Sequence, residues 1–291
     1  MKSRPTGPTG SLLAQGLRYN PFLSGVPVES LFVDPRSESF LFRLERLIES
    51  GGFALVTGDP GVGKSTLLRL AQSRLEALRE VSVAVLTRPQ SALADFYREL
   101  GDLFGITLSV SNRWGGFKAL RERWRAHIAS TLIRPVIFID EAQNASPDIL
   151  EELRVLSSDE LDSRALLTVV LSGDLRLAER LKRVDLVPLA SRVRVRVHLE
   201  PSTREELVAL LAHLLQKSGA PQLMTQELLE LLADHAAGNR RALMLLSQEL
   251  LEHAASEDLA VIDEKVFFDV MGDASGRRRT GDSRTKSKGR G

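Results

Sequence analysis

Gly58-Asp59-Pro60-Gly61-Val62-Gly63-Lys64-Ser65-Thr66 is the segment from which the fold of this chain can be predicted most directly. It fits the P-loop pattern G-x-x-x-x-G-K-[ST] at each fixed position. The apolar residues 53–57 before it predict a short buried strand, and the leucine-rich residues 67–71 after it predict the start of a helix. A strand, a glycine-rich turn and a helix in this order direct backbone N–H groups at a phosphate bound at the helix N-terminus.

The residue types within this turn suit a nucleoside triphosphate. The three glycines allow a close approach of the backbone that a Cβ would block. Lys64 is expected to reach the β- and γ-phosphates, and Ser65 is expected to bind Mg²⁺. The alternative, a glycine-rich turn with an incidental lysine, is disfavoured by the flanking strand and helix. We therefore assign nucleotide contacts to the whole stretch, namely Gly58, Asp59, Pro60, Gly61, Val62, Gly63, Lys64, Ser65 and Thr66.

A second signal lies at residues 134–141, which read Arg-Pro-Val-Ile-Phe-Ile-Asp-Glu. The continuous β-branched and aromatic residues predict a strand buried on both faces of a parallel sheet. Asp140 and Glu141 follow it, at the edge where open α/β sheets bind ligands. Asp140 is expected to hold the Mg²⁺ shell, and Glu141 is expected to polarise the attacking water as a general base. This Walker B pattern is weak alone, but with the P-loop upstream both halves of a metal–phosphate site are present.

Composition limits the class of protein. The chain has 291 residues, of which 43% are hydrophobic and 26% are charged, as in soluble globular proteins. The absence of cysteine excludes disulfides and thiolate metal sites, and the five histidines lack ligand spacing. No apolar run approaches the ~20 residues of a membrane helix, and the N-terminus lacks the apolar core of a signal peptide. These features predict a cytoplasmic protein without a membrane segment.

The net charge of +1 is distributed unevenly along the chain. Residues 272–291 carry seven lysines and arginines against two acids, and residues 1–18 carry three cations and no acid. Both ends are rich in Gly, Ser, Thr or Pro, which predicts disordered basic arms. Such arms either bind nucleic-acid phosphate or only solubilise a protein, and composition alone leaves both open.

Two domains are predicted between these arms. Five strand-like runs alternate with helical stretches, which predicts an α/β fold with a five-stranded, mostly parallel sheet sandwiched by helices. Beyond Pro201 the pattern is all helical and leucine-rich, which predicts a small all-helical domain. The expected organisation is a disordered arm at 1–18, a nucleotide-binding α/β domain at 19–200, a helical domain at 201–271 and a disordered tail at 272–291.

The P-loop, the Walker B run, a fifth strand preceded by arginine and the helical domain together resemble an AAA+ ATPase, and more closely its ExeA-like branch. In that branch the Walker B run continues as D-E-A-Q-N, and residues 140–147 here read Asp-Glu-Ala-Gln-Asn-Ala-Ser-Pro. Residues 150–157, 192–199 and 238–241 also resemble the branch, so that the similarity covers about residues 19–255. The resemblance implies ATP as the nucleotide, Mg²⁺-dependent hydrolysis to ADP and phosphate, and a helical lid.

The resemblance also implies catalytic roles outside the two motifs. Ser172 matches sensor 1, which contacts the γ-phosphate or the lytic water. Arg192 matches the trans-acting arginine finger, and Arg196 is the fallback. A finger supplied in trans adds positive charge to the transition state only when a neighbouring subunit docks, so hydrolysis would depend on assembly. We therefore predict that this chain forms a ring or filament stabilised by ATP.

Further nucleotide contacts are implied at the two ends of the similar region. Arg241 matches sensor 2, in the lid helix that closes on the nucleotide. Its neighbour Arg240 stands where proline is common in the branch, which leaves open which arginine points inward. Asn20 and Phe22, in an Asn-Pro-Phe turn, resemble the N-terminal segment that borders the adenine.

Three functions remain open. The first is a helper ATPase of DNA transposition, resembling the TniB, TnsC and phage Mu B group, which assembles on duplex DNA and recruits or activates a transposase or integrase. The second is a secretion ATPase like ExeA, and the third is an assembly or signalling ATPase without nucleic acid. Secretion proteins of that kind continue into a membrane span that is absent here, and the basic ends favour DNA. Aromatic residues are only 5% of the chain, which favours duplex binding through phosphates over base stacking on single strands.

Overall fold

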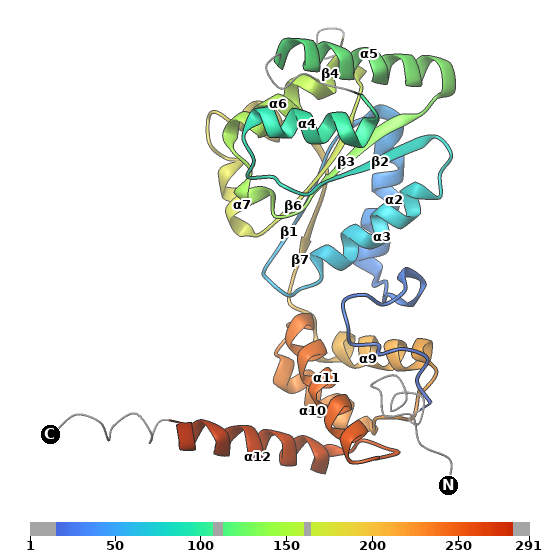
Figure 1. Ribbon diagram of the computed structural model, residues 1–291, viewed down its shortest axis with the longest axis vertical. Coiled ribbons are helices and arrows are strands. Elements are labelled where there is room, and N and C mark those ends of the chain that lie inside the picture. Colours follow the sequence, from blue (N-terminus) through green and yellow to red (C-terminus); the bar gives the residue numbers. More distant parts are fainter. Residues whose placement is uncertain (1–15, 107–112, 160–163, 282–291) are drawn as a thin grey trace, which may run out of the picture. The chain divides into compact units, whose positions relative to one another are not determined.

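The computed structural model describes residues 16–106, 113–159 and 164–281 (Figure 1). These residues divide into two compact units. One unit is the α/β body at Val33–Glu200, and the other combines the residues up to Phe32 with those from Pro201 onward. We call them the α/β unit and the helical unit, and each is described by itself.

The strands of the α/β unit form one sheet. Its members are β1 (Gly52–Gly58), β2 (Val81–Leu86), β3 (Arg134–Ile139), β6 (Thr168–Gly173) and β7 (Val193–Leu199). Their spatial order is β2-β3-β6-β1-β7, and each adjacent pair is parallel. Every residue of β1 and β6 is buried, as expected for apolar runs covered on both faces. The predicted α/β fold with a five-stranded parallel sheet is confirmed.

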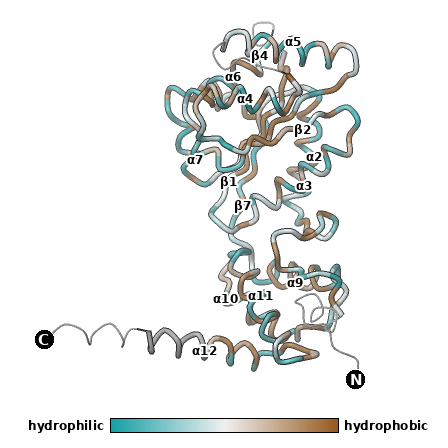
Figure 2. Tube along the Cα trace, in the orientation of Figure 1, coloured by the Kyte–Doolittle hydropathy of each residue, from teal (hydrophilic) through white to brown (hydrophobic). Residues whose placement is uncertain are grey.

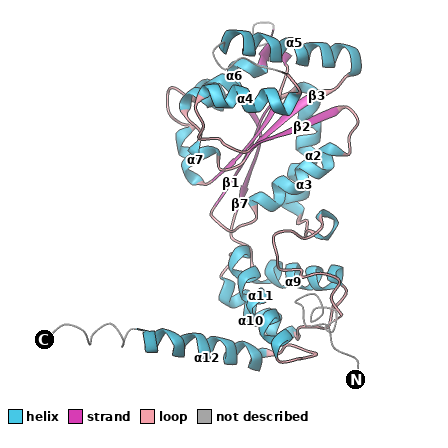
Figure 3. Ribbon diagram, in the orientation of Figure 1, coloured by secondary structure: helices cyan, strands magenta, loops and turns pink. Residues whose placement is uncertain are grey.

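Helices cover both faces of this sheet. They are α2 (Pro35–Ser50), α3 (Lys64–Glu76), α4 (Leu93–Phe104), α5 (Arg113–Thr131), α6 (Pro147–Ser157), α7 (Leu175–Arg180) and α8 (Val187–Ala190). Figure 3 shows α2 and α3 on one side, with α4, α6 and α7 on the other. Figure 2 shows that apolar residues concentrate in the strands between these layers. Ser146 caps the N-terminus of α6, because its hydroxyl accepts a hydrogen bond from the Ile149 amide at 3.2 Å.

A short hairpin, β4 (Ser158–Asp159) with β5 (Arg164–Ala165), was not expected from the sequence. The Asp159 side chain is 5% exposed and accepts hydrogen bonds from the guanidinium groups of Arg121 and Arg125 on α5. Arg121 also donates to the carbonyl of Val155 at the end of α6, at 2.9 Å. These contacts fix α5 against the hairpin, because a buried carboxylate is stable only when paired.

The helical unit contains η1 (Val28–Ser30), α9 (Arg204–Ser218), α10 (Gln226–Ala236), α11 (Arg240–Ser256) and α12 (Glu264–Gly281). Helix α9 begins with a capping box, in which the side chains of Thr203 and Glu206 each accept a hydrogen bond from the backbone N–H of the other. Leucines from α9, α10 and α11 form its core. No helix among the described residues has the length and apolarity to cross a membrane.

The limits of the helical unit differ from the sequence-based expectation at both ends. Leu17 and Phe22 are 1% and 3% exposed and pack into the leucine core, and the Arg18 amide donates to the Ser218 carbonyl at 2.8 Å. Residues 19–32 therefore group with the helical unit rather than with the α/β unit. Helix α12 continues to Gly281, past the expected limit at 271, since Ala and Arg favour helix and no proline interrupts it. The rest of the two predicted arms, residues 1–15 and 282–291, lies outside the described residues.

Candidate nucleotide-binding site

The fold brings the two sequence motifs together at the carboxyl edge of the sheet. Strand β6 lies between β1 and β3, with Ser172 opposite Val56 and Leu171 opposite Ile139. The P-loop follows β1, Asp140 follows β3, and Ser172 lies near the end of β6. Segments separated by about a hundred residues of sequence therefore meet at one place in the α/β unit.

The turn after β1 requires glycine at several positions. Gly61 and Gly63 have φ angles of 89° and 108°, in the left-handed region that other residues rarely adopt. A Cβ on Gly58 would lie 2.5 Å from the Leu199 carbonyl oxygen and 2.9 Å from a methyl group of Val62. Gly63 is the N-cap of α3 and has no capping side chain, which leaves the first amides of the helix open to a ligand.

Lys64 is only 7% exposed, at the first turn of α3. Its ammonium donates to the backbone carbonyls of Gly58 at 2.9 Å and Asp59 at 3.0 Å. These acceptors offset the cost of burying the charge and hold it inside the turn. The ammonium can exchange them for phosphate oxygens without leaving the loop. Asp59 and Pro60 are exposed, and Thr66 is half-buried.

Asp140 connects the P-loop helix with β6. Its two carboxylate oxygens accept hydrogen bonds from the Ser65 hydroxyl at 3.0 Å and the Ser172 hydroxyl at 2.8 Å. A hydroxyl beside a carboxylate is a hard oxygen donor pair that fits Mg²⁺, whose remaining ligands are usually waters and phosphates. The described residues contain no cluster of three or more acidic or histidine side chains able to hold a metal.

Glu141 adopts a left-handed backbone conformation with φ 51°. Its carboxylate accepts a hydrogen bond from the Gln143 amide, which lies on the 3₁₀ turn η2 (Ala142–Asn144). The Gln143 side chain is buried, and its oxygen accepts from the Asp174 amide at 3.4 Å. A Cβ on Gly173 would lie 2.4 Å from that oxygen, so glycine makes room for the contact. The sequence alone assigns no role to Gln143, although its position two residues after Glu141 is the available signal.

The loop after β6 adds charge beside these residues. Asp174 caps α7 and pairs with Arg176, which lowers the pKa of Asp174; the positive charge of Lys64 lowers it further. The pKa of the exposed Arg176 is raised, mainly by Asp174 and to a smaller extent by Glu141. Both residues therefore lie within electrostatic range of the site, and the sequence motifs single out neither of them.

We predict that Gln143→Ala lowers kcat for ATP hydrolysis about tenfold and changes the KM for ATP less than about twofold, because the side chain contacts Glu141 and no P-loop residue. Steady-state kinetics measure both constants. The matched control is Gln72→Ala, which removes a similar glutamine–glutamate hydrogen bond from α3. A reduction of kcat no larger than that of the control contradicts a positioning role for Gln143.

The two candidate finger residues lie close together in the chain: Arg192 directly precedes β7, and Arg196 lies within it. The carbonyl of Arg192 accepts from the Phe53 amide at 3.2 Å, which places Arg192 at the amino end of β1. The seven residues of β1 span about 20 Å, so Arg192 lies too far away to touch the P-loop of its own chain. Its guanidinium donates to the Pro188 carbonyl. Arg196 lies in mid-strand opposite Leu55, is exposed, and donates to the Ala190 carbonyl at 3.0 Å.

The other residues implied by the resemblance belong to the helical unit. Asn20 accepts a hydrogen bond from the Phe22 amide at 2.9 Å, and the Phe22 ring is buried in the leucine core. Arg240 is half-buried and donates to the Ser202 hydroxyl at 2.9 Å. Arg241 is exposed at the start of α11, and the described residues supply no partner for its guanidinium. Of the two arginines, Arg241 is therefore the one open to a ligand, and its sensor role remains a prediction.

Comparisons with known proteins agree with this geometry. Residues 46–181 match the family described as AAA domain. Over 233 residues the chain is 31% identical to general secretion pathway protein A of Aeromonas hydrophila, a match that covers 78% of this chain and 42% of that protein. The chain thus spans less than half the length of this curated relative.

Solved structures share the fold across most of the chain. Cdc6p of Pyrobaculum aerophilum matches with a TM-score of 0.67 and 16% identity, covering 83% of this chain and 67% of that one. The ORC1 protein of Aeropyrum pernix, solved in complex with DNA, matches with a TM-score of 0.68 and 18% identity, covering 89% and 70%. At these identities the likeness establishes a common fold and nothing further.

Proposed function

We propose a function for this chain from the premise that it is an AAA+ protein of the ExeA-like branch, as its AAA domain and its similarity to general secretion pathway protein A indicate. In this proposal the chain hydrolyses ATP with Mg²⁺ and uses the nucleotide cycle to assemble on duplex DNA. The observation that carries the ATPase part is the pair of hydrogen bonds by which Ser65 and Ser172 converge on Asp140.

Each residue of the site has a separate part in the proposed hydrolysis. Lys64 would move its charge from the loop carbonyls to the β- and γ-phosphates. Ser65 and Asp140 would hold Mg²⁺, which neutralises phosphate charge when bound. Glu141 would orient the attacking water and accept its proton, and Ser172 would keep Asp140 in place and approach the γ-phosphate. In the lid, Arg241 would add charge to the nucleotide, and Asn20 would lie beside the adenine. Phe22, whose ring is buried in the leucine core, would hold this turn in place instead of contacting the base.

Hydrolysis would require a second copy of the chain. The distance along β1 separates Arg192 from the P-loop of its own chain, which supports a role toward the nucleotide of a neighbour. Arg196 is the second candidate for this role. An ATP-stabilised ring or filament follows from such an arrangement, because each nucleotide would be contacted from two subunits.

The DNA part of the proposal is supported by charge and by likeness of fold. Residues 277–279 are three consecutive arginines in α12, and residues 284–290 add four cations beyond it. The structural relatives include an ORC1 protein in complex with DNA, with which the chain shares its fold. A transposase or integrase partner rests on the resemblance to transposition helper ATPases. Because both proposed ligands, ATP and duplex DNA, are found in the cytoplasm, we place the function there.

We predict that duplex DNA is retained on a filter by this chain only when ATP or a non-hydrolysable analogue is present. Removing residues 282–291, which leaves α12 complete, should weaken retention. It should also reduce the slope of log affinity against log salt by about one for each phosphate that the shortened chain no longer neutralises. Filter binding at several salt concentrations measures both quantities.

The matched control keeps the chain length and neutralises exposed cations elsewhere. Arg98, Lys182 and Arg183 of the α/β unit are each changed to glutamine, and retention should be unaffected. Equal retention with and without nucleotide would speak against the DNA part of the proposal while leaving the ATPase part intact.

A secretion ATPase is the second candidate, and the observation that favours it is the similarity to general secretion pathway protein A. The same AAA+ core would then drive assembly on a protein component instead of DNA. The filter experiment discriminates, since a secretion ATPase predicts ATP binding without nucleotide-dependent retention of DNA. An assembly or signalling ATPase gives the same negative result.

A further inference from the structure

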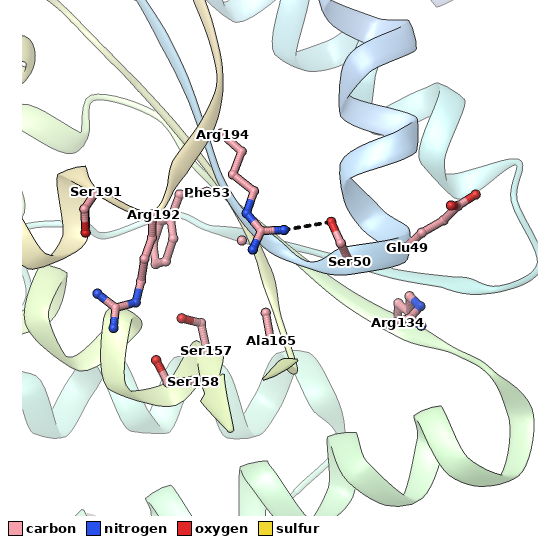
Figure 4. Close-up of a pocket in the computed structure, with 11 residues that line it drawn as sticks. Glu49, Ser50, Phe53, Arg134, Ser157, Ser158, Ala165, Ser191, Arg192 and Arg194 are labelled. Carbon is pink, nitrogen blue, oxygen red and sulfur yellow. Dashed lines mark hydrogen bonds between the residues drawn. The ribbon is translucent and has the colours of Figure 1, made fainter. Parts of the chain in front are cut away.

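A polar pocket lies at the edge of the sheet opposite the P-loop, at the amino ends of β1, β3 and β7 (Figure 4). Its volume is about 380 Å³, within the range of small-ligand sites. Three arginines line it: Arg134 at the start of β3, and Arg192 and Arg194 at the start of β7. We call it the arginine pocket. It shares no residue with the P-loop or the Walker B pair Asp140 and Glu141.

The lining of the arginine pocket carries a positive charge. Among the described residues of the lining, three arginines face a single carboxylate, that of Glu49, which gives these residues a formal charge of +2. Arg194 donates to the Ser50 hydroxyl at 3.1 Å, and the described residues form no ion pair with it or with Arg134. The carboxylate of Glu151 lies within electrostatic range of Arg192, but its pKa is lowered chiefly by the hydrogen bonds from Arg154. That charge is thus largely neutralised on its own helix.

Hydroxyl groups supply the other polar contacts. Ser157 and Ser158, at the junction of α6 and β4, lie on the same side of the pocket as Arg192 in Figure 4, and Ser191 precedes Arg192. Guanidinium forks match the oxygens of a phosphate group in pairs, and hydroxyls donate to it without adding charge. A bounded pocket of this size accommodates the end of a polyphosphate better than the continuous backbone of a duplex.

We propose that the arginine pocket binds the terminal phosphates of a polyphosphate anion, either free in solution or at the end of a nucleotide held by another copy of the chain. The second source rests on the proposed function. Arg134, Arg194 and the serines extend the contact well beyond the predicted finger residue Arg192. The pocket is lined by the amino ends of β1, β3 and β7, which are far apart in the sequence, so no local sequence motif predicts it.

The free anion is tested with inorganic pyrophosphate. Isothermal titration is performed on the Lys64→Ala chain, in which the P-loop no longer competes for phosphate. Saturable binding is expected, with affinity about tenfold weaker when Arg194→Gln is added and largely restored by Arg194→Lys. The control Arg98→Gln, at an exposed and paired arginine of α4, should bind as the parent does.

The nucleotide of a second copy is tested by mixing two defective chains with a non-hydrolysable ATP analogue. Lys64→Ala keeps the arginine pocket and lacks the P-loop lysine, whereas Arg134→Gln/Arg194→Gln keeps the P-loop and lacks most of the pocket charge. Sedimentation should show analogue-dependent association in the mixture and monomers for either variant alone.

A positive result in either arm that depends on Arg194 supports the proposal and identifies the source of the phosphate. The proposal is overturned if pyrophosphate binding is absent or unaffected by Arg194→Gln and the mixture also fails to associate. Binding of ATP to the wild-type chain, measured by the same titration, reports separately on the P-loop, so that failure of the pocket and failure of the proposed ATPase are distinguishable.

Discussion

The Glu141→Gln variant should bind ATP as tightly as the wild-type chain and hydrolyse it about 10²- to 10⁴-fold more slowly, a range typical for removal of a general base. Asp140 accepts hydrogen bonds from the Ser65 and Ser172 hydroxyls and from the backbone amide of Glu141, and the Glu141 carboxylate takes no part in these bonds. The substitution therefore leaves the proposed Mg²⁺ ligands in place. The Gln143 amide, which donates to Glu141 in the wild-type chain, retains an acceptor in the new amide oxygen.

Two measurements separate binding from turnover in this variant. Titration with ATP gives the affinity, and release of phosphate under single-turnover conditions gives the rate of hydrolysis. Glu122→Gln, at an exposed glutamate of α5 paired with Lys118, is the control for removal of one negative charge. Hydrolysis that persists at the wild-type rate would remove Glu141 from the role of general base and leave the phosphate site unaffected.

The Lys64→Ala variant should bind ATP more weakly by on the order of 10²-fold or more, because one buried ammonium is expected to donate to both the β- and γ-phosphates. Lys64 is 7% exposed, and its ammonium donates to two carbonyls of the loop. Its removal therefore takes away the positive charge inside the turn and leaves these carbonyls without that donor. Lys64→Arg should not restore binding, since the larger planar guanidinium does not fit where the ammonium lies.

Folding must be checked for this variant, because a buried side chain is removed. Thermal unfolding followed by circular dichroism serves this purpose, and Lys118→Ala, at an exposed lysine, is the control for removal of one positive charge. A folded Lys64→Ala chain that binds ATP at wild-type affinity would contradict the assignment of the P-loop. The consequence would extend to the proposed assembly, which depends on bound nucleotide.

The sheet and the placement of the two motifs at its carboxyl edge were predictable because their signals are local. A continuous apolar run such as residues 134–139 suits only a strand covered on both faces, and five such runs alternating with helices imply a parallel sheet. The glycines of the P-loop are required by the backbone angles of a single turn. Asp140 and Glu141 directly follow their strand, so the sequence alone placed them at the carboxyl edge of the sheet, where open α/β sheets usually bind ligands.

Domain limits were less predictable because they depend on burial between distant segments. Nothing near Leu17 or Phe22 in the sequence indicates that these side chains pack against leucines of α9, α10 and α11, far along the chain. The Asn20–Phe22 turn resembles a nucleotide-bordering segment, whereas the ring of Phe22 is part of the helical core. Local patterns predict elements, but the free energy of burying an apolar side chain decides which elements belong together.

The P-loop motif, the Walker B carboxylates and the parallel α/β sheet could be predicted from the sequence, because each depends on residues adjacent in the chain. The convergence of the Ser65 and Ser172 hydroxyls on Asp140, and the pocket that three arginines share at the amino edge, exist only in the folded chain. The physical reason is that parallel strands bring together ends whose spacing in the sequence is set by intervening helices, and no short-range pattern encodes that meeting.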